Sequence, residues 1–422
     1  MFIDSKASAV RGTVRIPTSK SHSIRAVFLA ALAEGTSTIR HRLRSADVDS
    51  AIAACKTLGA GIEESGEVLR ITGFNGKPTA PKNTIDVGNS GTTANFALAL
   101  AALCDKPVTV TADDQTRKRP IAPLLESLKQ LGAVIESSNN GLLPVTIRGP
   151  IKGGIADVAG STSQYLSALL IHGIFCETAA VFKLKSLNEK PYADMTVAWL
   201  KKLGVRLEQD NHSEYRLAPR QSLKAFEADI PSDWSSAAFF LVLAAIPGCE
   251  VTLEGLDFTD TQGDKEVVNY LKAMGADIEV GDRVKIRGKK LRGTTLDLNN
   301  TPDALPAMAV AGALAEGVTH LTNVPQARIK ETDRIAVMCQ ELAKMGADIT
   351  EERDGLIIKG GTPLRGTAVA GHYDHRVVMS LAVAGLAAAG TTTIDSAEAI
   401  NITFPDFVDK MRACGADMRL YR

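Results

Sequence analysis

The segment KMGADI, Lys344–Ile349, decides the fold, because five other segments of the chain resemble it. In chain order the copies are TLGAGI, QLGAVI, KLGVRL, AMGADI, KMGADI and ACGADM, and their shared glycines are Gly59, Gly132, Gly204, Gly275, Gly346 and Gly415. Successive glycines are 73, 72, 71, 71 and 69 residues apart. This even spacing predicts six copies of one structural unit.

The residues on either side of each glycine predict a helix followed by a strand. Before Gly346, the segment VMCQELAKM places its apolar residues at helical spacing, and the glycine supplies the left-handed residue that ends such a helix. The alternating segment ADITEE that follows is typical of a strand.

A second series runs in step with the first and adds another helix to each repeat. In each member a polar cluster precedes an apolar helix, a turn and a Thr/Val-rich strand. Because these helices are apolar on nearly every side, we expect them to be buried and covered by sheets. The sequence therefore predicts an α/β protein, and three repeats in each of two similar lobes is the simplest division. The clusters begin SKSHSIRA, GNSGTTAN, GSTSQYLS, SDWSSAAF, TPDALPAM and YDHRVVMS.

Composition limits the class of protein before any motif is considered. A chain of 422 residues with 45% hydrophobic and 23% charged residues is typical of a globular protein with about two domains. Its 48 basic and 48 acidic residues balance, so no global charge favours nucleic acid or an anionic membrane. The longest apolar run, Ala237–Ile246, is about half of a membrane crossing, and the N-terminal residues have no apolar segment of the signal-peptide kind.

The cysteines predict neither zinc nor disulfides. The six are scattered, and none stands in a CxxC motif or near clustered histidines. This pattern fits free, mostly buried thiols in a reducing cytoplasm. We therefore expect a cytoplasmic protein without a metal site.

The polar clusters combine helix caps with cations, and capping alone does not explain the cations. Ser, Thr, Asp and Asn are preferred caps, and capping accounts for the cluster at Asp233–Ser236. Positive charge is unfavourable at a helix start, yet four repeats place cations at a helix start or just before it. In one of them the cations directly precede Pro120, where we expect a helix to begin. Two lobes that face each other would bring these cations together around a polyanion. The cations are Lys20, Arg25, Arg117, Lys118, Arg119, Lys330, Arg334 and Arg376, with His375 beside them.

Acidic residues stand among these cations. Asp303, Glu331, Asp333 and Asp374 should remain ionised there and could accept protons, with Glu331 next to Lys330 able to transfer one. For Asp333 and Asp374 a role as cap or counter-ion is an equal alternative. The sequence has no Ser-His-Asp arrangement, Walker loop or GxGxxG after a strand, so neither an acyl-enzyme nor a dinucleotide cofactor is indicated.

At these residues the sequence resembles the enolpyruvyl transferases, and within them the branch whose acceptor is shikimate 3-phosphate. The resemblance covers the whole chain, because ten motifs occur in the family's order. They are SKS with Arg25, GNSGTT at Gly88–Thr93, RKRP at Arg117–Pro120, TSQ at Thr162–Gln164, KPY at Lys190–Tyr192, SSA at Ser235–Ala237, PDA at Pro302–Ala304, KETDR at Lys330–Arg334, DHR at Asp374–Arg376 and TFPDF at Thr403–Phe407.

The resemblance implies a fold in more detail than the pattern does. It implies a two-lobed, inside-out α/β barrel made of six βαβαββ repeats. The lower domain would comprise residues 1–19 and 230–422, the upper domain residues 20–229, and the active site would lie in the cleft between them.

It also implies a reaction, in which the 5-hydroxyl of the acceptor adds to C2 of phosphoenolpyruvate and phosphate then leaves. This step belongs to the shikimate pathway, which leads to chorismate and the aromatic amino acids. We expect a monomer that binds these two small molecules and no nucleic acid or membrane, and that uses no metal or organic cofactor.

Roles for individual residues follow from the same resemblance. Asp303 would accept the hydroxyl proton, Glu331 would handle the methylene proton, and His375 would order that site; Lys20 is the fourth residue expected to act in catalysis. Phosphoenolpyruvate would be bound by Lys20, Gly91, Arg119, Arg334 and Arg376. The acceptor would be bound by Ser21, Arg25, Thr162, Ser163, Gln164, Tyr192, Asp303 and Lys330.

Four positions depart from the family pattern and leave alternatives open. Asn95 stands where an Arg is common, Glu189 where a Ser often contacts the acceptor phosphate, and Ile402 where many members have Lys. The GSTSQ turn is one residue shorter than usual. The alternatives are an enolpyruvyl transferase with another hydroxyl acceptor, a protein related to RNA 3′-phosphate cyclases, and a binding protein without catalysis. A reactive Cys in the loop Asp113–Pro120, expected of the UDP-N-acetylglucosamine enzyme, is absent.

Overall fold

The computed structural model describes residues 1–137 and 140–422, and the chain divides into two compact units. One is the continuous segment Thr18–Ile230, which we call the inserted unit. The other combines Met1–Pro17 with Pro231–Arg422, and we call it the split unit. Each unit is built around its own cluster of buried hydrophobic side chains.

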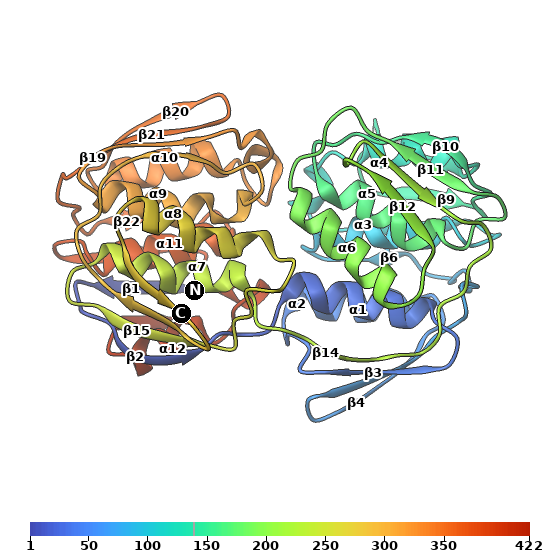
Figure 1. Cartoon of the computed structure of the whole chain (residues 1–422), viewed down its shortest axis with the longest axis horizontal. Helices are drawn as coiled ribbons and strands as arrows, with labels where there is room; N and C mark the ends of the chain where they lie inside the picture. Colours follow the sequence, from blue (N-terminus) through green and yellow to red (C-terminus); the bar gives the residue numbers. More distant parts are fainter. Residues whose placement is uncertain (138–139) are drawn as a thin grey trace. The chain divides into compact units, whose positions relative to one another are not determined.

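The inserted unit contains three repeats of helices and strands, shown in blue to green in Figure 1. Its helices are α1 (Lys20–Leu32), α2 (Ala46–Thr57), α3 (Gly91–Ala101), α4 (Ala122–Gln130), α5 (Ser163–Gly173) and α6 (Lys190–Lys202), with the short 3-10 helix η1 (Thr116–Lys118). Its strands are β3 (Thr36–Arg40), β4 (Gly61–Ser65), β5 (Val68–Thr72), β6 (Ile85–Asp86), β7 (Val108–Thr111), β8 (Val134–Glu136), β9 (Val145–Arg148), β10 (Gly154–Asp157), β11 (Ala180–Lys183), β12 (Leu207–Asp210), β13 (Glu214–Leu217) and β14 (Glu227–Asp229).

The split unit contains three further repeats. Its helices are α7 (Trp234–Leu241), α8 (Val267–Ala273), α9 (Leu305–Leu314), α10 (Arg334–Lys344), α11 (His375–Gly385) and α12 (Phe407–Ala413), with 3-10 helices η2 (Val242–Ala245), η3 (Gly263–Glu266), η4 (Pro302–Ala304), η5 (Pro325–Ile329) and η6 (Ala397–Ile402). Its strands are β1 (Phe2–Lys6), β2 (Arg11–Arg15), β15 (Glu250–Glu254), β16 (Asp277–Val280), β17 (Val284–Arg287), β18 (Thr295–Asp297), β19 (Gly317–Thr322), β20 (Asp348–Glu352), β21 (Gly355–Gly360), β22 (Ala368–Val369), β23 (Thr391–Ile394) and β24 (Asp417–Tyr421).

The sheets confirm the predicted βαβαββ repeat. The described residues form six four-stranded sheets, three in each unit, with orders such as β6-β7-β9-β8 and β18-β19-β21-β20. In both of these the first two strands are parallel and the remaining pairs antiparallel. One parallel pair joined through a helix, followed by a hairpin, is the pattern that each repeat requires.

Three strands complete repeats that lie far away in sequence. Strand β14, at the end of the inserted unit, is parallel to β3 near its beginning. Strand β2 is parallel to β15, across more than two hundred residues of chain, and β1 lies between β23 and β24. The N-terminal strands therefore belong to the first and the last repeat of the split unit.

The first helix of each repeat is buried, as its composition predicts. In α1 every residue from His22 to Leu32 is buried, and in α9 only Leu314 is not. Figure 1 shows α7, α9 and α11 inside the split unit with strands around them. All six repeat glycines have φ between 80° and 108°, which confirms their predicted left-handed conformation.

The polar clusters lie at helix starts, with one correction. The side chains of Ser19, Ser90, Thr162, Asp233 and Asp374 cap α1, α3, α5, α7 and α11. The expectation that Pro120 opens a helix is wrong, because α4 begins at Ala122 and uses Pro123 in its first turn. The carbonyl oxygen of Pro120 instead accepts a hydrogen bond from the Tyr165 hydroxyl.

Within the described part of the chain no helix is long and apolar enough to cross a membrane. The six cysteines are free thiols, all buried except the half-buried Cys339. Across residues 1–137 and 140–422, no group of three or more His, Cys, Asp and Glu side chains has an arrangement that could hold a metal ion.

Candidate functional site

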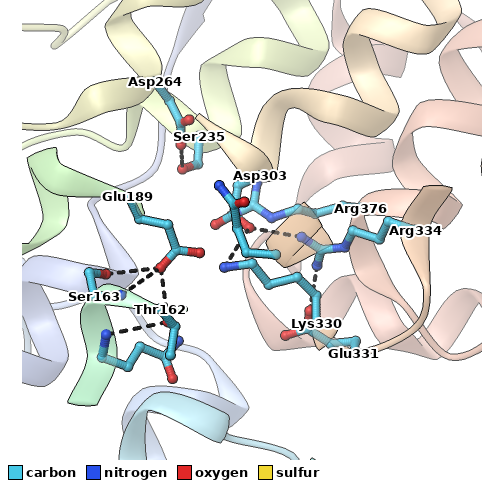
Figure 2. A network of polar contacts seen from close by, with 12 residues as sticks. Thr162, Ser163, Glu189, Ser235, Asp264, Asp303, Lys330, Glu331, Arg334 and Arg376 are labelled. Atoms are coloured by element: carbon cyan, nitrogen blue, oxygen red, sulfur yellow. Dashed lines mark hydrogen bonds and ion pairs between the residues drawn. The ribbon is translucent and has the colours of Figure 1, made fainter. Parts of the chain in front are cut away.

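In the split unit the starts of three helices bring acids and cations together. Asp303 comes from η4 before α9, Lys330 to Arg334 precede and begin α10, and Asp374 to Arg376 cap and begin α11. Ion pairs of Arg334 and Arg376 with Asp303, and of Arg334 with Asp374, join the starts of the three helices. Figure 2 shows Asp303, Glu331, Arg334 and Arg376 pointing toward one another. We call Asp303, Lys330, Glu331, Arg334, Asp374 and Arg376 the acid–base cluster.

Arg334 is the centre of the acid–base cluster. Its side chain is 1% exposed, and its Nη1 lies 2.8 Å from Oδ1 of Asp303. Its Nε lies 2.8 Å from Oδ2 of Asp374, and its Nη2 donates to Oε2 of Glu331 at 2.5 Å. Three carboxylates around one buried guanidinium fix its position.

Asp303 holds the second arginine and lies near the lysine. Its Oδ2 accepts a hydrogen bond from Arg376 Nη2 at 2.9 Å, and its Oδ1 is 4.0 Å from Lys330 Nζ. Burial raises the pKa of Asp303, but the positive charges of Arg376, Lys330 and Arg334 outweigh it and lower the pKa below its usual range. The carboxylate is therefore ionised at neutral pH.

The charges of Arg334 and its partners reinforce one another. Burial lowers the pKa of Arg334, but Asp374, Glu331 and Asp303 more than compensate, so the net shift is upward. Arg334 therefore stays charged inside the protein. Asp374 is fully buried and also caps α11, because its Oδ1 accepts from the Arg376 amide at 2.9 Å. His375 is buried in the first turn of α11.

In the inserted unit Lys20 is held by an acid that the sequence did not single out. Lys20 begins α1, and its Nζ lies 3.1 Å from Oδ2 of Asp47, which is buried in the first turn of α2. The neighbouring Asp49 in the same turn is exposed. In sequence Asp47 and Asp49 suit a helix N-terminus equally well. Only the packing of α2 against α1 determines which of them lies next to Lys20.

Arg119 lies against the start of α3. A β-carbon added to Gly91 would be 2.0 Å from Arg119 Nη1, so the guanidinium occupies the space that any side chain at position 91 would need. Gly91 is the first residue of α3, directly after the capping Ser90. The backbone amides at the start of α3 therefore lie beside the guanidinium of Arg119. Such an arrangement is suited to binding an anion.

Arg25 is buried and is held by neutral oxygens. Its guanidinium donates to Thr196 Oγ1 at 2.8 Å, to the Tyr192 carbonyl at 2.9 Å and to the Ser21 carbonyl at 3.1 Å. Burial, the larger effect, lowers the pKa of Arg25 to about 10, which leaves it charged at neutral pH. These contacts bring three predicted acceptor-binding residues together: Ser21, Arg25 and Tyr192.

The remaining predicted residues of this unit lie at the start of α5. Thr162 caps the helix, and its Oγ1 accepts from the Gln164 amide at 3.3 Å. Asn95 of α3 donates to the side-chain oxygen of Gln164 at 2.8 Å. The carboxylate of Glu189, one of the positions that depart from the family pattern, accepts hydrogen bonds from Thr162 and Ser163 (Figure 2). Burial and then the charge of Glu189 raise the pKa of Tyr165 to about 12.

The structure thus gathers the predicted residues within each unit. A chain of ion pairs through Asp303 and Arg334 links Lys330, Arg376 and Glu331, and His375 stands next to Arg376 in the same helical turn. In the inserted unit Arg119 touches Gly91, Arg25 contacts Ser21 and Tyr192, and Thr162 to Gln164 form one helix start. Asp47 is the residue that sequence reasoning missed.

Comparisons with known proteins agree with one another over almost the whole chain. The family model described as EPSP synthase (3-phosphoshikimate 1-carboxyvinyltransferase) matches residues 5–411. A protein of Acetivibrio thermocellus named 3-phosphoshikimate 1-carboxyvinyltransferase is 50% identical over 420 residues, which are 99% of each chain. A protein of the same name from Ruminiclostridium cellulolyticum is 46% identical over the full length of both chains.

A solved structure gives the same result for the fold. An EPSP synthase from Acinetobacter baumannii is similar to this chain with a TM-score of 0.84 and 28% sequence identity, over 100% of both chains. The similarity therefore extends from the sequence to the fold, along the whole chain.

Proposed function

Because the chain belongs to the EPSP synthase family, we propose that its buried helix starts bind and activate the two substrates of that family's reaction. The chain is a 3-phosphoshikimate 1-carboxyvinyltransferase: it transfers the enolpyruvyl group of phosphoenolpyruvate to the 5-hydroxyl of shikimate 3-phosphate. The products are 5-enolpyruvylshikimate 3-phosphate and phosphate. The shikimate pathway uses this step to make chorismate and the aromatic amino acids.

The acids of the acid–base cluster would move the protons. Addition of the 5-hydroxyl to C2 of phosphoenolpyruvate forms a C–O bond, releases the hydroxyl proton and adds a proton to the methylene carbon. Loss of phosphate from the tetrahedral intermediate then breaks a C–O bond and removes a proton from the new methyl group. Asp303 is assigned to the hydroxyl proton and Glu331 to the carbon proton, with Lys20 as a further catalytic residue and His375 ordering the site.

The cations would hold the anionic groups of both substrates. For phosphoenolpyruvate the assignment is Lys20, Gly91, Arg119, Arg334 and Arg376, and for the acceptor it is Ser21, Arg25, Thr162, Ser163, Gln164, Tyr192, Asp303 and Lys330. The observation that supports these roles best is the Asp303 carboxylate, ionised and in contact with Arg334 and Arg376. It combines a proton acceptor with two fork-shaped donors suited to a carboxylate or phosphate.

A coupled assay tests the assignment of the reaction. Purified protein should release phosphate from phosphoenolpyruvate only when shikimate 3-phosphate is added, and without added metal or cofactor. Release with another hydroxyl acceptor and none with shikimate 3-phosphate would overturn the acceptor. We further propose a cytoplasmic monomer, and light scattering coupled to gel filtration should give one mass near 44.7 kDa.

A further inference from the structure

Glu189 occupies hydrogen-bond donors at the start of α5. Its Oε2 accepts from Thr162 Oγ1 at 2.9 Å, from the Ser163 amide at 3.1 Å and from Ser163 Oγ at 2.9 Å. The residue is 1% exposed, and Figure 2 shows its carboxylate turned toward both side chains. A single oxygen therefore engages three donors at a helix N-terminus, where the helix dipole favours an anion.

The local backbone is bent to place the carboxylate there. Glu189 precedes α6 with φ of 57°, a left-handed conformation that costs a residue with a β-carbon about 1 kcal/mol. Its side chain does not cap α6, the helix that it precedes. It reaches instead to α5 in the same repeat, so the contact with Thr162 and Ser163 compensates for an unfavourable conformation.

We propose that Glu189 is an internal competitor of the acceptor's phosphate and thereby sets the affinity of the enzyme for its phosphorylated substrate. The inference rests on the proposed function, which assigns Thr162 and Ser163 to the acceptor. A phosphate needs the same amide and hydroxyl donors, and two anions cannot share them in a buried site without strong repulsion. Glu189 must therefore withdraw before the phosphate binds.

Competition of this kind lowers the apparent affinity for shikimate 3-phosphate, although the contacts of the bound substrate stay the same. The dissociation constant rises by the reciprocal of the fraction of molecules in which the donors are free. If the carboxylate holds them in about nine of ten molecules, the loss is roughly tenfold. Shikimate, which lacks the phosphate, makes no use of these donors and leaves Glu189 in place. Glu189 thus also reduces the preference for shikimate 3-phosphate over shikimate.

The variant Glu189→Ala tests this, because alanine neither competes for the donors nor donates to a phosphate. The dissociation constant for shikimate 3-phosphate, measured by calorimetry, should fall roughly tenfold, and the inhibition constant of inorganic phosphate against that substrate should fall with it. KM for phosphoenolpyruvate and binding of shikimate should change less than about twofold. Glu177→Ala, at an exposed acid near the end of α5, is the matched control and should behave as wild type.

The outcomes separate this inference from the proposed function. Unchanged or weaker binding of shikimate 3-phosphate by folded Glu189→Ala protein would overturn it, since Glu189 would then support the site. Glu189→Gly, which suits the positive φ, provides a second folded variant if alanine lowers the melting temperature. If the wild-type protein releases no phosphate with shikimate 3-phosphate, the proposed function fails, whatever the variants do.

Discussion

Nη1 of Arg334 lies 2.8 Å from Oδ1 of Asp303, and the other oxygen of that carboxylate accepts a hydrogen bond from Arg376. The residue proposed as a proton acceptor is thus paired with both arginines proposed to bind phosphoenolpyruvate. An incoming carboxylate or phosphate would share these arginines with Asp303 and weaken the charge that lowers its pKa. Substrate binding would in this way make Asp303 a stronger base.

Replacing Asp303 with Asn should therefore remove catalysis while the fold remains. The amide keeps the shape of the side chain but cannot accept the hydroxyl proton, so kcat should fall by a factor of about 10² to 10⁴. Steady-state kinetics at saturating concentrations of both substrates measure this. The exposed Asp282→Asn is the control. A kcat near the wild-type value would exclude Asp303 as the acceptor of that proton.

Asp374 should act by positioning Arg334. Because it binds Nε and Nη2 of that guanidinium, Asp374→Asn should raise KM for phosphoenolpyruvate about tenfold or more and lower kcat less. It should also destabilise the protein, since Arg334 would stay buried with less negative charge around it.

Asp333→Asn provides the matched comparison, because Asp333 caps α10 and pairs with the partly exposed Arg328. We expect it to cost about 1 kcal/mol of stability at most, with little effect on KM. Equal effects of the two variants on KM for phosphoenolpyruvate would contradict the special role of Asp374.

Adding a single methyl group at Gly91 should displace Arg119. In Gly91→Ala the new carbon would lie 2.0 Å from Nη1 of Arg119, and the flexible side chain would have to move while the helix stays. KM for phosphoenolpyruvate should rise several-fold, with an unchanged melting temperature. Gly281→Ala, at a position with ample space, is the control. An unchanged KM would show that Arg119 does not bind that substrate.

His172 should make the stability of the protein depend on pH. It is fully buried against Phe28 and Phe96, and burial, the larger effect, lowers its pKa from 6.5 to about 4. In this interval the unfolded chain binds a proton that the folded chain does not, so stability falls as the pH falls from 6.5 toward 4. Between pH 7 and pH 5 the loss from this residue is about 2 kcal/mol.

The variant His172→Phe isolates that effect. Free energies of unfolding from urea titrations at pH 7 and pH 5 should differ less in the variant than in the wild type, by about 2 kcal/mol. Parallel pH dependence in the two proteins would mean that other groups cause the change.

The sequence predicts the repeat well because each unit carries its own local signals. A helix, a left-handed glycine and an alternating strand are determined within about 20 residues, and the six copies reinforce the assignment. Pairing of distant strands has no such signal: nothing near Arg11 shows that β2 will pair with Glu250–Glu254. The boundaries of the two domains as drawn from the sequence stay a prediction.

The sequence predicted site residues that stand in motifs of the family. It could not predict contacts that depend on how the helices and loops pack. Asp47 and Asp49 are equivalent in sequence, but only Asp47 faces Lys20. The contact of Glu189 with Thr162 and Ser163 depends on how the loop before α6 approaches α5. Sequence reasoning identified Glu189 as unusual, and the side-chain geometry shows which donors it engages.

The placement of the N-terminal strands has a consequence for how the protein is made. During synthesis β1 and β2 leave the ribosome before the inserted unit, and β2 cannot pair with β15 until that unit has been translated. The pairing of β1 with β24 forms later still, because Phe2 pairs with Tyr421. The inserted unit is continuous and can fold as it emerges, whereas the split unit can be completed only once β24 has emerged. Until then its first two strands have unpaired edges, which can pair with the strands of other chains.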